Sequence, residues 1–318
     1  MPLPLVGTGS FPGGHPTKVL SLAVNSENET RGGWVRLDGA VNVRDLGGLP
    51  TEGGGRTLPC RLLRADNLQD LSEPDVRLLV DRFRVRQVLD LRTSVEIELE
   101  GPGPITREAA VTVRELTLYP EAGKRTDALT ENVTGVSGAA PQTPWMSGRR
   151  PALEIDAGER PAVIHYLGYL RHASANIVES LRAIGARDDG ATLVHCAAGK
   201  DRTGTVVALA LLVAGVRRED VVADYARSGE VIDKIMGRLA STTTYAADVS
   251  DAEGNPVTDA TMDPTTWAAI ANRQRPRAET MQRLLEILDE RAGGPLQWLT
   301  DAGLSSAEQQ AISTHLLG

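Results

Sequence analysis

One segment of strand, small-residue loop and helix constrains the fold most. Thr192–Cys196 has the β-branched and apolar residues typical of a buried strand, and Thr205–Val213 has those of a buried helix. Between them lies Ala197–Asp201, a loop of mostly small residues in which Gly199 supplies conformational freedom. A helix N-terminus leaves backbone N–H groups unpaired and carries about half a positive charge. The segment therefore predicts an anion-binding turn at the carboxyl end of a strand.

This turn differs from the nucleotide-binding loop. That loop needs Gly five residues before its Gly-Lys pair and Ser or Thr after the Lys, whereas Val194 and Asp201 occupy these positions here. Cys196 ends the strand instead. A thiol has a pKa near 8.5, and helix N-termini and nearby cations lower it. With Lys200 and Arg202 close in sequence, we expect Cys196 to be largely ionised.

Arg202 lies six residues after Cys196. Its planar guanidinium can bind two oxygens of a phosphoryl group and can bind more tightly as charge moves onto those oxygens in the transition state. A thiolate beneath an arginine-bound phosphate predicts covalent phosphatase chemistry. The alternative interpretation is a buried strand cysteine followed by a charged turn.

Composition excludes several other classes. The 318 residues include 34 Lys+Arg and 42 Asp+Glu, so the net charge is −8. This acidic balance argues against nucleic acid as a general partner, but it allows one basic pocket for an anionic substrate. No apolar run approaches the roughly 20 residues of a membrane helix, so we expect no integral membrane segment. Cys60 and Cys196 are too few for a disulfide scaffold, and Cys60 is interpreted as an apolar strand residue or a redox partner of Cys196.

Residues 1–33 differ from the rest of the chain. They are rich in Gly, Pro, Ser, Thr and Asn, and their one apolar stretch, Val19–Val24, is short. A secretory signal has a basic start and a longer apolar core, whereas Lys18 is the only early base. We interpret 1–33 as a flexible N-terminal extension and expect a cytoplasmic location, with export by a route without a signal peptide left open.

Short apolar runs alternate with helical patterns over the globular part. The runs that suit further strands are Cys60–Arg64, Gln87–Leu91 and Val111–Leu118. Helices are predicted after Ser72 and over His165–Ile184, and the chain after Thr203 is predicted almost entirely helical apart from a polar loop at Tyr245–Pro264. The Gly-, Pro- and Thr-rich stretch Glu121–Glu159 is too long for a plain connection. The pattern predicts an α/β fold with a mainly parallel sheet flanked by helices.

Three segments resemble a known family. His195–Gly204 resembles the signature loop of protein tyrosine phosphatases. Asn42–Gly48, together with Asp90–Thr93 followed by Glu96, is similar to the bacterial branch that has serine- and lipid-phosphatase relatives. The resemblance to a mycobacterial member extends from about residue 37 to the C-terminus. It implies one phosphatase domain over 34–318, within which 228–291 forms a helical lid or a permanently packed cap.

The resemblance also implies the roles of several residues. Cys196 attacks phosphorus and forms a phosphocysteine, Arg202 binds the phosphate, and the Thr203 hydroxyl hydrogen-bonds the thiolate. His195 orients the loop and tunes the thiolate. Neither a metal nor a cofactor is expected. The residues that form the phosphate-binding loop are then Ala197, Ala198, Gly199, Lys200, Asp201 and Arg202.

The general acid stays open between two carboxylates. Asp201 lies inside the loop and Asp90 ends a predicted strand; we favour Asp201. The structural alternatives are a helix N-cap for Asp201 and, for Asp90, a partner of Arg92 or of the phosphate-binding loop. Asn42, with Arg44 and Asp45 beside it, is interpreted as part of a structural turn.

Phosphotyrosine proteins are the expected substrates, with phosphoserine, phosphothreonine and phosphoinositides as further candidates. Lys200 favours phosphoinositides or adds general affinity for anions. The rival functions are a phosphoprotein-binding pseudophosphatase and an arsenate reductase or sulfurtransferase that uses the same anion loop. The sequence does not determine the oligomeric state.

Overall fold

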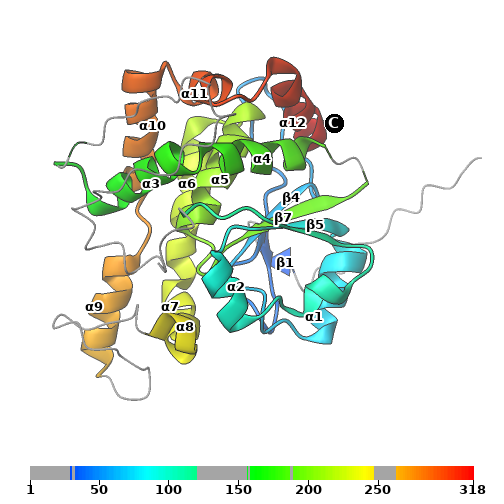
Figure 1. The fold of residues 1–318 in the computed structure, drawn as a ribbon, viewed down its shortest axis with the longest axis vertical. Coiled ribbons are helices and arrows are strands. Elements are labelled where there is room, and N and C mark those ends of the chain that lie inside the picture. The colour runs from blue at the N-terminus through cyan, green and yellow to red at the C-terminus, as the bar shows by residue number, and fades with distance from the viewer. Residues whose placement is uncertain (1–28, 31–32, 120–155, 157, 187–188, 247–262) are drawn as a thin grey trace, which may run out of the picture.

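A computed structural model describes residues 29–30, 33–119, 156, 158–186, 189–246 and 263–318 (Figure 1). Most of the predicted N-terminal extension, most of the stretch Glu121–Glu159 and residues 247–262 of the predicted polar loop lie outside the described residues.

The described residues contain one seven-stranded sheet in the order β1-β2-β3-β4-β7-β5-β6. Its parallel part, which confirms the predicted mainly parallel sheet, consists of β4 (Leu62–Ala65), β7 (Ala191–His195), β5 (Val85–Asp90) and β6 (Thr112–Glu115). Three two-residue strands extend it in antiparallel fashion: β3 (Arg44–Asp45), β2 (Trp34–Val35) and β1 (Glu29–Thr30). Glu29 and Thr30 therefore belong to the sheet, although the sequence assigned them to the extension.

Helices cover both faces of the sheet (Figure 1). On one side lie α1 (Glu73–Arg77), the π-helical turn η1 (Leu78–Arg82), α2 (Ser94–Glu100) and the 3-10 turn η2 (Pro104–Arg107). On the other lie α3 (Pro161–His172), α4 (Ser174–Gly185), α5 (Asp201–Val213), α6 (Arg218–Arg227), α10 (Ala278–Ala292), α11 (Pro295–Asp301) and α12 (Ser306–Leu317). The 3-10 turn η4 (Ser228–Val231), α7 (Ile232–Ser241), α8 (Thr243–Ala246) and α9 (Pro264–Gln274) lie together at one side of the molecule.

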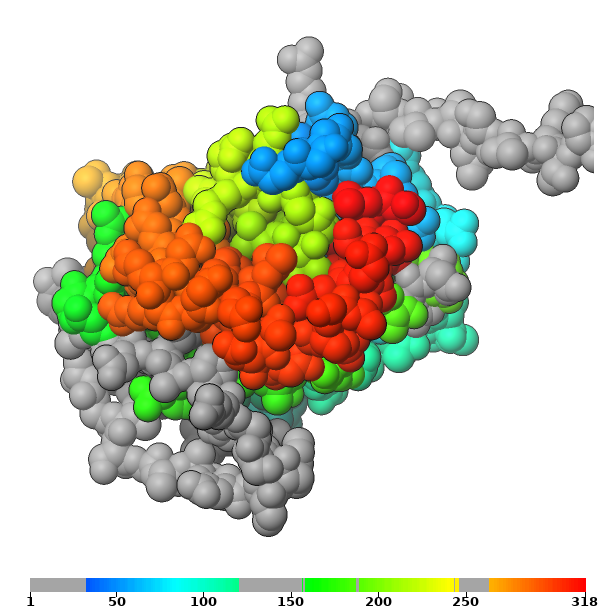
Figure 2. All heavy atoms as spheres, turned by 90° about the horizontal axis from the view of Figure 1, so that it is seen from above, coloured from blue at the N-terminus to red at the C-terminus, as the bar shows by residue number. Residues whose placement is uncertain are grey.

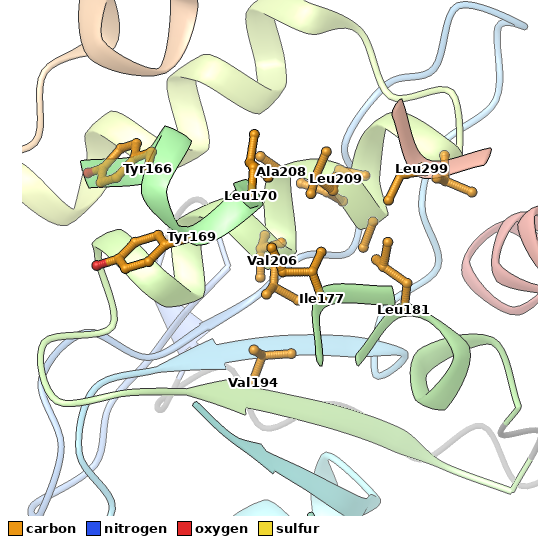
Figure 3. Close-up of a cluster of buried hydrophobic side chains, with 14 of the residues drawn as sticks. Tyr166, Tyr169, Leu170, Ile177, Leu181, Val194, Val206, Ala208, Leu209 and Leu299 are labelled. Atoms are coloured by element: carbon orange, nitrogen blue, oxygen red, sulfur yellow. The ribbon is translucent and has the colours of Figure 1, made fainter. Parts of the chain in front are cut away.

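The two faces of the sheet pack against different cores because side chains alternate in direction along each strand. Successive side chains of a strand point to opposite faces. In β7, Val194 packs with the core beneath α3, α4 and α5 (Figure 3), whereas Leu193 packs with the core beneath α1. Leu62 and Leu63 of β4 divide in the same way. The central strands β4, β7 and β5 are therefore buried on both sides, as is usual for parallel strands, whereas the edge strand β6 is partly exposed.

The predicted helix His165–Ile184 is two helices rather than one. The chain leaves the helical conformation at Ala173, where φ is −121° and ψ is 23°. The break lets α3 pack against α10 while α4 packs against α12. Figure 2 shows α10, α11 and α12, in orange and red, spread over this face of the molecule.

The region 228–291 divides between two cores. Met281, Leu284 and Leu288 of α10 belong to the main core above the sheet. Ile235 and Met236 of α7 instead join a separate apolar cluster with residues of α9. The helices α7, α8 and α9, called the cap below, are thus a layer apart from the main core.

Cys60 lies in a turn before β4 with φ of 56°, not in a strand. Cys196 directly follows β7, which runs parallel to β4 with Leu62 opposite Thr192. The two cysteines therefore lie near opposite ends of the strands, on the order of 20 Å apart at about 3.3 Å per residue. A disulfide needs Cα atoms within about 7 Å, so the fold excludes a direct bond between them.

Candidate active site

The strand, loop and helix predicted from the sequence form one continuous turn at the carboxyl end of β7. Cys196 follows the strand and is fully buried, and α5 begins at Asp201. Gly199 has φ of 66°, and a Cβ at this position would lie 2.4 Å from the carbonyl oxygen of Ala65. Only glycine combines this backbone conformation with so close an approach. Carboxyl ends of parallel strands are where α/β proteins place ligand sites.

Three successive carbonyls of the loop are held from outside. The Asn67 backbone N–H donates to Ala197 O (3.0 Å), Asn42 Nδ2 donates to Ala198 O (2.9 Å), and Arg64 Nη2 donates to Gly199 O (2.6 Å). In a trans peptide the carbonyl and the following N–H point in opposite directions. The N–H groups of the next three residues therefore face the other side of the loop, where they can bind an anion.

The side chains that hold these carbonyls belong to a buried ionic network. Asp224 of α6 accepts from Arg44 Nε (3.0 Å) and from Arg64 Nη1 (2.6 Å). Arg44 Nη1 also donates to Asn42 Oδ1 (2.6 Å), which orients the amide that binds Ala198. Burial lowers the pKa of Arg44 to about 10, although Asp224 opposes this shift. Despite its own burial, Asp224 has its pKa lowered to about 2 because Arg44 and Arg64 outweigh the cost of desolvation. Two cations around one carboxylate leave a net positive charge behind the loop.

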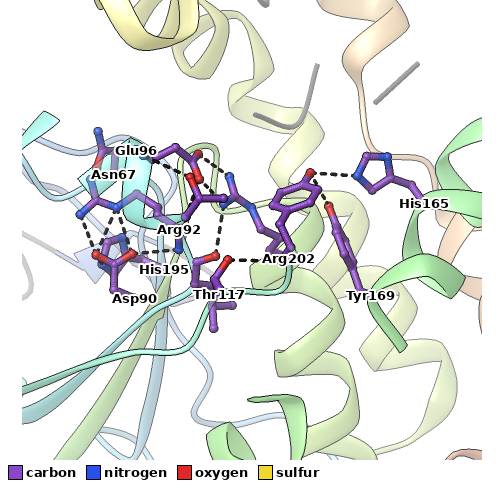
Figure 4. Close-up of polar contacts among 12 residues, drawn as sticks. Asn67, Asp90, Arg92, Glu96, Thr117, His165, Tyr169, His195 and Arg202 are labelled. Carbon is purple, nitrogen blue, oxygen red and sulfur yellow. Dashed lines mark hydrogen bonds and ion pairs between the residues drawn. The ribbon is translucent and has the colours of Figure 1, made fainter. Parts of the chain in front are cut away.

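Arg202 is held in a fixed orientation (Figure 4). Its Nη1 and Nη2 donate to the two carboxylate oxygens of Glu96 at 2.7 and 2.8 Å, and both side chains are fully buried. Glu96 is itself fixed in a capping box at the start of α2, where it accepts from Thr93 N. The ring of Tyr119 lies 5.1 Å from the guanidinium carbon of Arg202. This planar cation is therefore oriented before any ligand binds.

Asp201 is the first residue of α5 and is 9% exposed. Its Oδ1 accepts a hydrogen bond from the Tyr166 hydroxyl, and its Oδ2 lies 2.5 Å from Lys200 Nζ. Lys200 occupies the N-cap position without a side-chain cap bond. The carboxylate of Asp201 therefore does not cap the helix but lies between a phenol and an ammonium group beside the loop.

Asp90 lies at the end of β5 and binds Arg92 (Figure 4). Its two carboxylate oxygens accept from the Nε and Nη2 atoms of Arg92, the shortest contact being 2.6 Å, and Oδ2 lies 3.5 Å from His195 Nε2. Burial alone would raise the pKa of Asp90, but His195 and Arg92 lower it below its usual value. Burial lowers the pKa of His195 to about 4, despite the neighbouring Asp90 charge.

Thr203 lies in the first turn of α5, one residue after Arg202. It is fully buried, and among the described residues its Oγ1 has no hydrogen-bond partner. A buried hydroxyl without a partner is costly unless it has a task in another state of the site.

The cap covers the phosphate loop directly. Ala198 packs in one apolar cluster with Ile235 and Met236 of α7 and Ile270 of α9. Arg238 of α7 also binds the loop after β4, where its guanidinium lies 2.5 Å from Asp66 and 3.0 Å from Asp70.

One aromatic residue of the cap lies near Glu96, the carboxylate that binds Arg202. Tyr245 of α8 is buried, and burial, followed by the nearby Glu96 charge, raises its pKa. The cap therefore closes over the site from the phosphate loop to the Glu96–Arg202 pair.

The structure thus brings together all the predicted site residues. They are His195, Cys196, Ala197, Ala198, Gly199, Lys200, Asp201, Arg202, Thr203 and Asp90. Sequence reasoning did not assign site roles to Asn42, Arg64, Glu96 and Tyr166. For Glu96 a signal existed, since Thr93-x-x-Glu96 is a capping-box pattern that places the carboxylate at a helix start.

The comparisons with known proteins agree with this geometry. A sequence model described as the tyrosine phosphatase family matches residues 35–318. The chain belongs to the tyrosine phosphatase family. It is 29% identical over 289 residues to the triple specificity protein phosphatase PtpB of Mycobacterium tuberculosis, an alignment that covers 89% of this chain and 98% of the relative. It is 30% identical over 151 residues to a tyrosine-protein phosphatase of Nostoc commune, covering 48% of this chain and 47% of the relative.

Membership of the tyrosine phosphatase family confirms the expected enzyme class, a protein-tyrosine phosphatase, and hence a phosphorylated substrate. It also confirms the family resemblance drawn from the three sequence segments. Within the described part of this tyrosine phosphatase, no helix is long and apolar enough to cross a membrane.

Proposed function

We propose that the protein hydrolyses phosphomonoesters through a phosphocysteine on Cys196. The observation that carries this proposal is the loop around Cys196, whose three carbonyls are turned outward and whose Arg202 is oriented by Glu96. A dianionic phosphate would meet inward-facing N–H groups, a helix N-terminus and a fixed guanidinium. These groups stabilise the charge on the equatorial oxygens in the transition state.

In the first step, the Cys196 thiolate attacks phosphorus while the bond from phosphorus to the leaving oxygen breaks. Asp201 gives its proton to that oxygen. In the second step, Asp201 takes a proton from water, the water oxygen attacks phosphorus, and the S–P bond breaks to restore the thiolate. The buried Thr203 hydroxyl would donate a hydrogen bond to the departing thiolate, which gives its unpartnered Oγ1 a task.

Asp201 fits the role of the acid better than Asp90. Both oxygens of each carboxylate are engaged, those of Asp201 by Tyr166 and Lys200 and those of Asp90 by Arg92. Asp201 lies in the loop itself, however, beside a lysine that can turn to a bound phosphate, whereas Arg92 holds both oxygens of Asp90 and the pKa of Asp90 is lowered. We propose that Asp90 orients Arg92 and contacts His195, next to Cys196. This is the structural alternative considered for Asp90 from the sequence.

We further propose that the cap acts as a lid. Cys196 is fully buried and Ala198 is 3% exposed beneath α7, so a phosphorylated side chain must displace the cap to reach the thiolate. Lids of this kind exclude water and select substrates. The main core does not need the cap, because α7 and α9 pack in their own cluster.

For substrates we propose phosphotyrosine proteins first, with phosphoserine, phosphothreonine and phosphoinositides as further substrates. The name of the Mycobacterium tuberculosis relative, a triple specificity phosphatase, supports this breadth. Lys200 lies in the loop with its ammonium 2.5 Å from Asp201 Oδ2, so its charge can add affinity for a second anionic group.

The test compares turnover of a phosphotyrosine peptide and of a phosphoinositide in EDTA, for wild type and Cys196→Ser. We expect activity that survives the chelator and is lost in Cys196→Ser, which should still bind substrate. Activity that Cys196→Ser retains would refute the covalent mechanism. Tight binding by a wild-type protein that turns over neither substrate would favour the phosphoprotein-binding alternative.

Lys200→Ala in the same assay addresses the substrate class. We expect it to reduce phosphoinositide turnover more than phosphotyrosine turnover. An equal loss on both substrates would reduce Lys200 to general electrostatic attraction.

A further inference from the structure

A chain of hydroxyl groups leads from the interior of the protein to Asp201. Tyr166 of α3 donates to Asp201 Oδ1, and the Tyr166 hydroxyl oxygen lies 2.7 Å from that of Tyr225 of α6. Both tyrosines are buried, at 1% and 2% exposure. Figure 3 shows Tyr166 on α3, among the side chains of the main core. Side chains of α6, α3 and α5 thus form one hydrogen-bonded chain that ends at a carboxylate.

The direction of the chain follows from the number of protons. Each phenol has one proton, and an ionised carboxylate can only accept. If Tyr166 donates to Asp201, then Tyr225 must donate to Tyr166. Burial and, next, the Asp201 charge raise the pKa of both phenols, so both keep their protons.

Packing alone does not account for the two hydroxyls. Phenylalanine at either position would fill almost the same volume without burying a polar group. Burying a hydroxyl is unfavourable unless it is hydrogen-bonded, and here the bonds end on a carboxylate beside the phosphate loop. The two hydroxyls are therefore explained by the hydrogen bonds that end on Asp201 rather than by packing in the core.

We propose that Tyr166, supported by Tyr225, is a positioning residue for proton transfer by Asp201; this inference rests on the proposed role of Asp201 as the acid. Tyr166 engages Oδ1, and Lys200 Nζ lies 2.5 Å from Oδ2. Oδ2 therefore carries the proton for the leaving group once the Lys200 ammonium has turned to the bound phosphate. The hydrogen bond from Tyr166 also strengthens as Asp201 loses that proton, because a bond to a charged acceptor is stronger than one to a neutral acceptor. Tyr166 thus stabilises the carboxylate that forms in the transition state.

The test compares two aryl phosphates, phenyl phosphate with a poor leaving group and 4-nitrophenyl phosphate with a good one. Tyr166→Phe should lower kcat/KM for phenyl phosphate by about 10- to 100-fold, the range expected for loss of a charge-assisted hydrogen bond. It should lower kcat/KM for 4-nitrophenyl phosphate by less than about threefold, since that leaving group needs little protonation. Tyr225→Phe leaves the bond to Asp201 in place and should give a smaller effect with the same preference.

Ser180→Ala provides a matched control, because it removes a buried hydroxyl of α4 that bonds only within its helix. It should change neither rate. Thermal unfolding of each variant separates a loss of fold from a loss of positioning. If Tyr166→Phe does not fold, Tyr225→Phe alone decides, and an equal effect on both substrates, or none, would overturn the proposal.

Asp201→Asn distinguishes failure of this inference from failure of the proposed acid. Asp201→Asn should slow phenyl phosphate more than 4-nitrophenyl phosphate, and in that background Tyr166→Phe should not change the substrate ratio further. If Asp201→Asn slows both equally, Asp201 is not the acid and this inference fails with it. If Asp201→Asn discriminates but Tyr166→Phe does not, only the positioning role of Tyr166 is refuted.

Discussion

The two sides of the phosphate loop are held in different ways. Behind the loop, Asn42 and Arg64 bind its carbonyls through a network that centres on Asp224 and is almost completely buried. In front of the loop, the cap contributes apolar contacts to Ala198 and one arginine, Arg238, whose side chain is 21% exposed. The back is fixed by directional bonds between buried charged groups. The front is covered by apolar contacts and by a partly exposed arginine, and the buried Asp66 carboxylate keeps its bonds from the Val41 and Asn42 N–H groups when that arginine separates.

This contrast is what the proposed chemistry requires. A loop that must present its N–H groups to a phosphate needs its carbonyls fixed before the ligand arrives, because reorganisation during the reaction is costly. A cover that must admit a phosphorylated side chain needs contacts that are weak and reversible. The difference between the two sides can be tested by breaking each in turn.

The largest effect should come from the back of the loop. Asp224→Asn leaves Arg44 and Arg64 buried without their carboxylate, and breaking a buried ion pair in this way costs about 3–5 kcal/mol of unfolding free energy. Denaturant unfolding measures this loss. The matched control is Asp289→Asn, whose partner Arg218 is 40% exposed, and it should cost less than about 1 kcal/mol. Equal losses in the two variants would mean that the network does not hold the loop as described.

A smaller effect is expected from the pH dependence of stability. Burial lowers the pKa of His195 to about 4 in the folded state, against 6.5 in the unfolded chain. Between these values the unfolded chain binds more protons, so stability falls as pH falls from 6.5 towards 4. From pH 7 to pH 5 the unfolding free energy should drop by about 2 kcal/mol.

His195→Gln removes this titration, so its unfolding free energy should change little between pH 7 and pH 5. Denaturant unfolding at the two pH values measures the difference between the variants. A His195→Gln protein that loses as much stability as wild type would assign the titration to another group.

The smallest effect on stability should come from the cap in front of the loop. A substitution there should nevertheless change how readily a reagent reaches Cys196. Arg238→Ala removes the ion pairs of α7 with Asp66 and Asp70 and should favour opening of the cap. We expect iodoacetate to inactivate the enzyme about three- to tenfold faster, the equivalent of roughly 1 kcal/mol, through access to Cys196. Lys234→Ala, which removes an exposed cation of the same helix, should leave the rate unchanged. An unchanged rate in Arg238→Ala would mean that this arginine does not hold the cap closed.

Most strands and the helix after the loop were predictable because their signals are local. The runs at Gln87–Leu91 and Thr192–Cys196 correspond to β5 and β7 within two residues. The predicted helix over His165–Ile184 was too long, because neither Gly nor Pro marks the break at Ala173, after which α4 packs against α12 whereas α3 packs against α10. Cys60 was placed in a strand because its apolar neighbours do not reveal a backbone with positive φ.

In the active site, too, the residues that lie within one segment were predictable and the distant ones were not. Cys196, Arg202 and the loop between them lie within seven consecutive residues, so their proximity was certain from the chain itself. The residues that hold them lie far away: Asn42 is 156 residues from Ala198, and Glu96 is 106 residues from Arg202. No local pattern links such pairs.

By itself, then, the sequence determined which groups lie together at the loop: a thiol, an arginine and a helix N-terminus placed together by covalent connection. Only the tertiary structure decided which carboxylate each cation binds and which face of the loop is covered. Asp90 binds Arg92 and Glu96 binds Arg202, whereas both were open to other partners in the chain. The physical reason is that ion pairs and hydrogen bonds act over a few ångströms. Their partners exist only once the sheet and helices have brought distant residues within that range.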